Sequence, residues 1–147
     1  MKINKYIYYI NCLLLLVFIF LGDYISKQAF EGSVYAAYNT GMSFSALSDY
    51  PVVLATITSI IILVLIVMIA KAKNYYLGIP LCFVAGGGLG NLNDRFQNYP
   101  YYGKGAVIDF INYGFFVGNL ADISIVAGII VFVINYSYVV KHKRTKS

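Results

Sequence analysis

The sequence predicts an all-α membrane protein with four transmembrane helices and a small extracytoplasmic β element. Of the 147 residues, 60% are hydrophobic and only 12% are charged, and the mean hydropathy is +0.72. A soluble domain has roughly 25% charged residues, so this chain has too few polar side chains to cover a surface that faces water. Apolar runs about as long as a membrane span recur, and basic residues collect just beyond their ends.

The first two predicted spans are residues 6–22 and 52–70. The first follows a short basic start and also has the length of a secretory signal peptide. Because no small-x-small cleavage pattern follows it, we expect a retained helix. Residues 23–51 are predicted to form a polar, turn-rich loop, in which Val34–Tyr38 fits a short strand and Ser43–Leu47 fits a short interfacial turn.

The third and fourth predicted spans are residues 75–93 and 117–140, separated by a second polar loop at 96–114. The third span contains Gly86 and Gly90 at GxxxG spacing, which lets helices approach closely in lipid. A dinucleotide-binding loop does not fit, because the last glycine of that motif is missing and no strand precedes it. With no internal repeat and no soluble segment, we expect residues 1–147 to form a single integral membrane domain.

The charge distribution predicts the orientation in the membrane. Four spans put both ends of the chain and the short turn with Lys71 and Lys73 on one side. That side carries eight basic residues and no acidic one, whereas the other side carries three basic and all six acidic residues. By the positive-inside rule, the basic side and both termini are cytoplasmic. The net charge of +5 forms no basic stripe, so nucleic acid is not an expected partner.

Polar side chains gather where the third and fourth predicted spans reach the outer surface. Asn91 and Asp94 are three residues apart at the end of one helix, and Asn119 and Asp122 have the same spacing at the start of the next. Asp109 lies between them in an apolar, strand-like run. Because the two helices are antiparallel, these groups share one depth, and ionisable groups there are candidates for a functional site.

The chemistry best suited to this cluster is acid–base catalysis. Two neighbouring carboxyl groups cannot both ionise cheaply, so one keeps a proton and the pair supplies a base and an acid. Asp109 and Asp122 together can therefore activate water and protonate a leaving amine, as peptide hydrolysis requires. Arg95 is placed to hold a carboxylate or a lipid phosphate by bidentate contact.

Other interpretations of the same residues remain open. Asp94 and Arg95 fit an ion pair at a helix end, and Asp122 fits a charge that favours the helix dipole. Cation binding by carboxylate and amide oxygens is disfavoured, because there is no dense Asp-x-Asp array.

Cys12 and Cys82 lie in apolar runs without metal-ligand spacing and are expected to be buried thiols. An ion- or proton-coupled carrier is the least favoured, since all six acidic residues are on one side and none sits in the middle of a span.

Five short motifs resemble the bacterial lipoprotein signal peptidase family, also called signal peptidase II. Asp23–Lys27 is similar to its D-x-x-[ST]-K element, and Asn39–Phe44 is similar to N-x-G-A-A-F. Gly90–Arg95 resembles G-N-x-x-D-R, Val107–Phe110 resembles V-V-D-F, and Asn119–Asp122 resembles the end of F-N-x-A-D. The motifs occur in the family's order and cover the chain from the first predicted helix to the last.

The resemblance implies an aspartic endopeptidase of the bacterial cytoplasmic membrane with its active site facing outside. The implied substrate is a prolipoprotein with a diacylglyceryl cysteine, cut before that cysteine, with acyl chains against the third and fourth helices. Membrane lipids are the other implied partner, the expected state is a monomer, and neither metal nor cofactor is expected. The resemblance makes Asp109 and Asp122 catalytic, and its supporting residues are Asp23, Lys27, Asn39, Gly41, Gly90, Asn91, Asp94, Arg95, Asn119 and Ala121.

A second hypothesis assigns the chain the same fold but no catalytic activity. The segment between Lys27 and Asn39 is shorter than is usual in the family, and it contributes to the family's extracytoplasmic sheet. The alternative is therefore a non-catalytic membrane protein that binds lipidated peptides, or an immunity-type factor.

Overall fold

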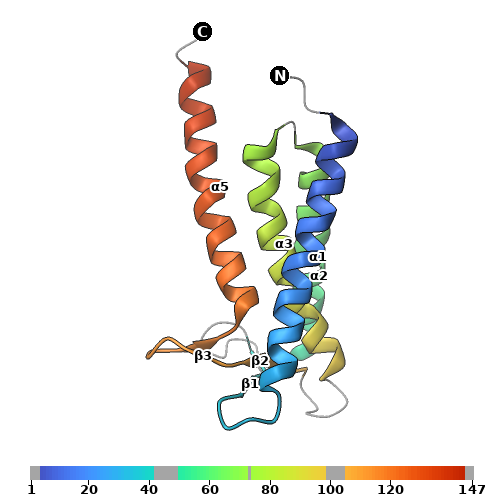
Figure 1. Cartoon of the computed structure of the whole chain (residues 1–147), viewed down its shortest axis with the longest axis vertical. Helices are drawn as coiled ribbons and strands as arrows, with labels where there is room; N and C mark the ends of the chain where they lie inside the picture. The colour runs from blue at the N-terminus through green and yellow to red at the C-terminus, as the bar shows by residue number, and fades with distance from the viewer. Residues whose placement is uncertain (1–3, 42–49, 73, 99–104, 145–147) are drawn as a thin grey trace.

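The computed structural model describes residues 4–41, 50–72, 74–98 and 105–144. Long helices run side by side, and short strands lie together at one end of them, opposite the start of α1 and the end of α5 (Figure 1). The helices are α1 (Lys5–Phe30), α2 (Pro51–Lys71), α3 (Tyr75–Gln97) and α5 (Leu120–Arg144). The strands are β1 (Ala37–Asn39), β2 (Val107–Asp109), β3 (Ile111–Asn112) and β4 (Val117–Gly118).

Three helical segments are long and apolar enough to cross a membrane: Lys5–Phe30, Pro51–Lys71 and Leu120–Tyr138. Each leaves large Ile, Leu and Val side chains on its outer surface, as a lipid-facing helix does. A mostly helical chain with such segments and a few short antiparallel strands confirms the predicted fold class in outline.

Helix α3 packs against α1, α2 and α5 and so lies at the centre of the bundle. Its glycines bring α1 close. A Cβ added to Gly86 would lie 3.0 Å from Ile19, and one added to Gly90 would overlap the carboxylate of Asp23. The GxxxG prediction is therefore confirmed as a contact between α3 and α1.

The contact between α3 and α5 depends on further small residues. A Cβ on Gly87 would come within 2.5 Å of the α5 backbone, and one on Gly128 would come within 2.7 Å of the Pro80 carbonyl. Pro80 has no N–H, so the Tyr76 carbonyl loses its helical donor. Asn135 Nδ2 of α5 donates to that carbonyl at 2.7 Å, so the proline break in α3 becomes an attachment point for α5.

Helix α1 is longer than the sequence predicts. Residues 23–30 were expected to begin a loop, but the helix continues without interruption to Phe30. Asp23 and Lys27 are one turn apart and form an ion pair of 2.7 Å, and both are buried. Their polarity, which suggested the end of a span, is satisfied inside the bundle instead.

The strands also differ in detail from the prediction. The strand expected at Val34–Tyr38 is β1, which begins at Ala37 and pairs antiparallel with β2, aligning Ala37 with Asp109. The helix expected from 117 begins at Leu120, because 117–118 form β4. Helix α3 extends beyond the expected end at 93, to Gln97. The turn predicted at Ser43–Leu47 lies outside the described residues.

Candidate active site

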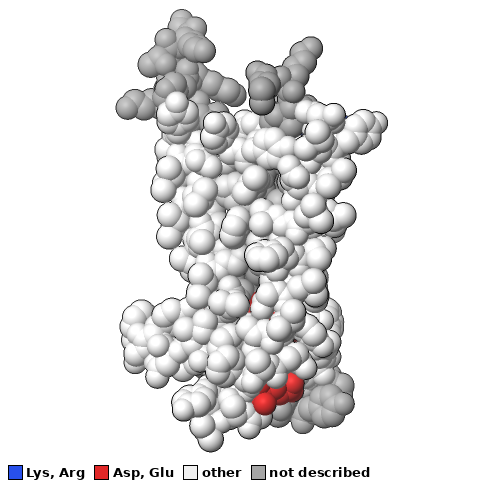
Figure 2. Space-filling view, in the orientation of Figure 1, with Lys and Arg blue, Asp and Glu red and all other residues white. Residues whose placement is uncertain are grey.

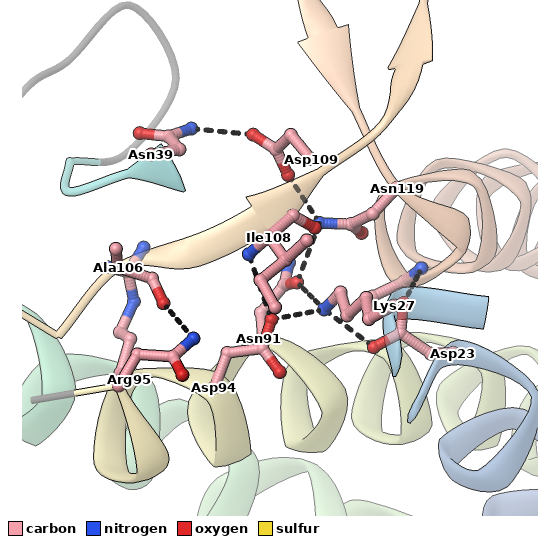
Figure 3. Close-up of polar contacts among 12 residues, drawn as sticks. Asp23, Lys27, Asn39, Asn91, Asp94, Arg95, Ala106, Ile108, Asp109 and Asn119 are labelled. Carbon is pink, nitrogen blue, oxygen red and sulfur yellow. Dashed lines mark hydrogen bonds and ion pairs between the residues drawn. The ribbon is translucent and has the colours of Figure 1, made fainter. Parts of the chain in front are cut away.

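The two candidate catalytic acids come from different elements and meet at one asparagine. Asp109 is the last residue of β2, and Asp122 lies in the first turn of α5. The Asn119 side chain donates from Nδ2 to Asp109 Oδ1 at 2.6 Å (Figure 3). Its backbone N–H donates to Asp122 Oδ2 at 3.2 Å. Asn119, which is fully buried, therefore holds both carboxyl groups.

Asn119 is also the N-cap of α5. Its Oδ1 accepts the backbone N–H of Asp122 at 3.0 Å, while the Asp122 carboxylate accepts the backbone N–H of Asn119. This reciprocal arrangement is a capping box, which satisfies two otherwise unpaired helix N–H groups and fixes the Asp122 side chain. Our sequence reasoning missed it, although an Asn-x-x-Asp spacing before an apolar run signals it.

The other oxygen of Asp109 is held by β1. Asn39 Nδ2 donates to Asp109 Oδ2 at 3.1 Å, and the Gly41 N–H donates to Asn39 Oδ1 at 3.0 Å, which fixes the orientation of the amide. Asp109 is only 2% exposed. Burial raises the pKa of Asp109 to about 6, and the neighbouring Asp122 adds to the rise, whereas the hydrogen bond from Asn39 opposes it.

A fully buried lysine lies beneath the two acids. Lys27 Nζ is 2.7 Å from Asp23 Oδ2 and 3.0 Å from Asp94 Oδ2, and it donates to Asn91 Oδ1 at 2.9 Å. These partners come from α1 and α3, so the lysine links the two helices. A buried ammonium needs such partners, because an unpaired charge in this environment is very costly.

The two buried carboxylates position the elements that carry the candidate catalytic acids. Asp23 Oδ1 accepts the backbone N–H of Ala121 at 2.8 Å, which attaches the start of α5 to α1. Asp94 Oδ2 accepts the backbone N–H of Ile108 at 3.1 Å, which attaches β2 to α3. Asp23 and Asp94 therefore hold the backbone just before Asp122 and just before Asp109, respectively.

Asn91 connects the buried lysine to Asp122. Its Oδ1 accepts from Lys27 and from Asn119 Nδ2, the latter at 3.1 Å. Because both of these partners are donors, the amide must direct its Nδ2 the other way, where it donates to Asp122 Oδ1 at 2.9 Å.

The Arg95 side chain contacts two backbone carbonyls in the loops. Its Nη2 donates to the Gly41 carbonyl at 2.7 Å and its Nη1 to the Gly105 carbonyl at 3.3 Å. Within the described residues, Asp94 forms its ion pair with Lys27 rather than with Arg95. In the structure, Arg95 therefore holds the backbones at Gly41 and Gly105, and its binding of a carboxylate or a lipid phosphate stays a prediction.

All the predicted site residues fall within this connected set, whose hydrogen bonds and ion pairs are drawn in part in Figure 3. Gly90 contributes by leaving room for the Asp23 carboxylate. Sequence reasoning missed Asn98, which is buried just after α3 and donates to the Ala106 carbonyl at 2.8 Å, ahead of β2. Among the described residues, no group of three or more His, Cys, Asp or Glu side chains is placed to hold a metal ion.

Comparison with known proteins gives one consistent family. A family model described as signal peptidase (SPase) II matches residues 15–138. The lipoprotein signal peptidase of Rickettsia conorii is 34% identical over 124 residues, covering 78% of this chain and 58% of that protein. The lipoprotein signal peptidase of Mycobacterium leprae is 34% identical over 97 residues, which cover 65% of this chain and 48% of that protein. The chain thus spans about half the length of the curated relatives it matches.

The fold has a solved counterpart. A bacterial membrane enzyme whose structure was determined by the in meso method at 2.3 Å resolution superposes with a TM-score of 0.75. The alignment covers 93% of this chain and 92% of that one, at 24% identity, so it establishes the likeness of fold. Since the family model extends over most of the chain and through all three apolar helices, this multi-pass membrane protein belongs to the signal peptidase II family.

Proposed function

We propose that this chain is a membrane aspartic endopeptidase that removes the signal peptide from prolipoproteins carrying a diacylglyceryl cysteine. The observation that supports this most directly is the contact of one buried asparagine, Asn119, with both Asp109 and Asp122. Two carboxyl groups held in this way form the acid–base pair that peptide hydrolysis needs. All of these groups come from one chain, which supports a monomer as the active unit.

The environments of the two acids support different roles. Asp122 accepts hydrogen bonds from Asn91 and Asn119 and lies at the N-terminus of α5, where the helix dipole favours a negative charge. Asp109 is more strongly desolvated, and its pKa is raised to about 6, so it is the member that keeps the shared proton. These roles describe the state of the pair that holds a single proton.

In the proposed reaction, Asp122 removes a proton from a water molecule whose oxygen attacks the scissile carbonyl carbon. Asp109 donates its proton to the carbonyl oxygen, which gives a neutral tetrahedral intermediate. When the carbon–nitrogen bond breaks, the proton held by Asp122 passes to the leaving amine, and Asp109 regains a proton from the intermediate. Each aspartate thus acts once as an acid and once as a base.

We further propose that α3 crosses the membrane with α1, α2 and α5, as part of one membrane domain over residues 1–147. Its 23 residues would extend about 35 Å, more than the roughly 30 Å of the hydrocarbon core. Its glycines and polar residues make it less apolar than the other three. That composition suits a helix surrounded by protein, because its polar groups are satisfied by neighbouring helices rather than by water.

The distribution of charge supports an outward-facing site. Lys5 and Lys71 lie at the end of the bundle opposite the strands that carry Asp109 (Figure 1). With the basic end cytoplasmic, both termini are inside and the acid pair faces the outer side of the membrane. The acyl chains of a substrate would then lie on outward surfaces of the bundle, because the α3 glycines already contact α1, α2 and α5.

Cleavage of a diacylglyceryl prolipoprotein by purified protein tests the proposal. Asp109→Asn and Asp122→Asn each keep the size of the side chain and remove its proton chemistry, so we expect the rate to fall by at least roughly a hundredfold. Glu31→Gln is the matched control, since Glu31 is an exposed acid at the C-cap of α1, and it should cleave normally. Near-normal cleavage by Asp109→Asn or by Asp122→Asn would reject the mechanism. The non-catalytic alternative, which no observation favours, predicts that the unmodified protein binds the prolipoprotein without forming product.

A further inference from the structure

The segment that joins the two acids is an aromatic hairpin. Strands β3 and β4 pair through Ile111 with Gly118, and the turn between them is closed by a hydrogen bond from the Tyr113 N–H to the Phe116 carbonyl at 2.9 Å. Gly114 supplies the positive φ of 91° that this tight turn needs. In Figure 1 the hairpin extends sideways from the lower end of α5, across the direction of the helices.

The hairpin exposes aromatic rings and carries no charge. Phe115, at its tip, is 81% exposed, and the neighbouring Phe116 packs against the Tyr113 ring with centroids 4.6 Å apart. No charged residue occurs between Phe110 and Leu120. In the space-filling view, the laterally projecting part of the molecule is white throughout (Figure 2). An exposed apolar surface without neighbouring charges marks a site of contact with a membrane or with another protein, because the rings gain free energy on leaving water.

The depth of the hairpin follows from its link to α5. The apolar segment long enough to cross a membrane begins at Leu120, two residues after β4 ends at Gly118. Two residues extend at most about 7 Å, so the base of the hairpin lies close to the hydrocarbon boundary. Leu120 and Ile123, in the first turn of α5, are exposed apolar residues, so the lipid-facing surface of α5 continues towards the hairpin.

We propose that the β3–β4 hairpin lies in the headgroup region of the bilayer, with the Phe115 ring inserted towards the acyl chains. Its partner is the lipid surface at the strand-bearing end of the helices. Because the hairpin joins Asp109 to Asp122, this contact would keep both acids at one depth, beside the lipid headgroups. The inference depends on the membrane location of the chain and not on the chemistry of the acid pair.

The chain contains no tryptophan, so Phe115→Trp creates a unique fluorescent reporter at the tip. The variant is reconstituted in phosphatidylethanolamine and phosphatidylglycerol vesicles in which part of the lipid carries bromine, either near the headgroup or deep in the acyl chains. We expect blue-shifted emission, stronger quenching by the shallow bromines than by the deep ones, and weak quenching by acrylamide. Phe116→Trp reports on the same tip if the first variant does not fold.

Two further single-tryptophan variants calibrate the measurement. Ile130, on the outer surface of α5, is 53% exposed, and Ile130→Trp should be quenched best by the deep bromines. Tyr35 is 71% exposed in the turn at 31–36, which extends beyond the end of α1 and past the level of the hairpin along the direction of the helices (Figure 1). Tyr35→Trp should therefore be quenched several-fold more by acrylamide. If Phe115→Trp is quenched by acrylamide as strongly as Tyr35→Trp, and the variant unfolds at the same temperature as the unmodified protein, the hairpin lies in water and the proposal is wrong.

Discussion

At the scale of single residues, the site depends on buried groups that each hold several partners. Lys27 balances Asp23 and Asp94, and those two carboxylates hold the backbones of α5 and β2. Asn119 in turn joins the two candidate catalytic acids. Each of these side chains therefore affects the position of an element as well as its own contacts, and substitutions should affect stability and catalysis together.

Replacing Lys27 with methionine tests this dependence. Lys27→Met keeps most of the side-chain volume but leaves two buried carboxylates without a cation, so we expect the free energy of unfolding to fall by about 3–5 kcal/mol. Denaturant or thermal unfolding in detergent measures the change. Lys71→Met is the matched control, because Lys71 is exposed at the end of α2, and it should change stability by no more than about 0.5 kcal/mol. Equal losses in the two variants would contradict the proposed role.

The pH dependence of cleavage tests the role of Asp109. With its pKa raised to about 6, Asp109 holds its proton below that pH and loses it above, so kcat/KM should decline as the pH rises through about 6. The hydrogen bond from Asn39 favours the ionised form, so Asn39→Ala should raise the pKa of Asp109 and move this decline to higher pH. Glu31→Gln should leave the profile in place. A shift towards lower pH in Asn39→Ala would refute the assignment.

At the scale of elements, close contacts between helices place the site. Gly90 lets α3 approach α1 where Asp23 binds the start of α5, and Gly87 lets α3 approach the α5 backbone directly. The polar network therefore requires small residues on α3, because larger ones would separate the helices that carry its members. The geometry of the acids is coupled to helix packing through these positions.

Gly90→Ala measures this coupling. The added methyl group would overlap the Asp23 carboxylate, so we expect a loss of about 1–3 kcal/mol in stability and a lower cleavage rate as Asp23 releases Ala121. Gly22→Ala in α1 is the matched control, because nothing lies within 4 Å of the added atom. It should be neutral or stabilise by up to about 1 kcal/mol, since alanine favours a helix more than glycine does. A fully active and stable Gly90→Ala would exclude the coupling.

At the scale of the whole molecule, the bundle separates its basic end from its acidic one. The candidate active site lies among the strands at one end, while the start of α1 and the end of α5 both lie at the other (Figure 1). Apolar side chains cover the outside of α1, α2 and α5, with α3 enclosed between them. In the proposed topology, such an arrangement would hold a polar site at the membrane surface without exposing it to lipid tails.

Labelling of single introduced cysteines tests the proposed four-span topology. The native Cys12 and Cys82 are buried, so their background reaction should be low. A membrane-impermeant maleimide added to spheroplasts should label Tyr35→Cys and Phe96→Cys, and it should label Lys71→Cys only after permeabilisation. Phe96, near the end of α3, is the decisive position. If Phe96→Cys behaves like Lys71→Cys, then α3 does not cross the membrane.

Much of the fold follows from local pattern. The apolar runs and their basic flanks predicted where the long helices lie, and the helical spacing of Asn91 and Asp94 placed them on one face. The family motifs then named the residues that the structure brings into one polar network. Hydropathy and helical periodicity reach only a few residues along the chain, so they are well suited to such features.

The remaining features depend on partners that are distant in sequence. Asp23 and Lys27 extend α1 rather than ending it because α3 supplies Asp94 and Asn91 around the buried lysine. Arg95 binds the Gly41 carbonyl, 54 residues away, rather than a nearby acid. Whether a charged residue ends a helix or is buried within one depends on the solvation and counter-charges that neighbouring helices provide. Composition and motif spacing therefore indicated the membrane class and the family, while packing of the helices set the helix ends, the strand positions and the contacts of the two acids.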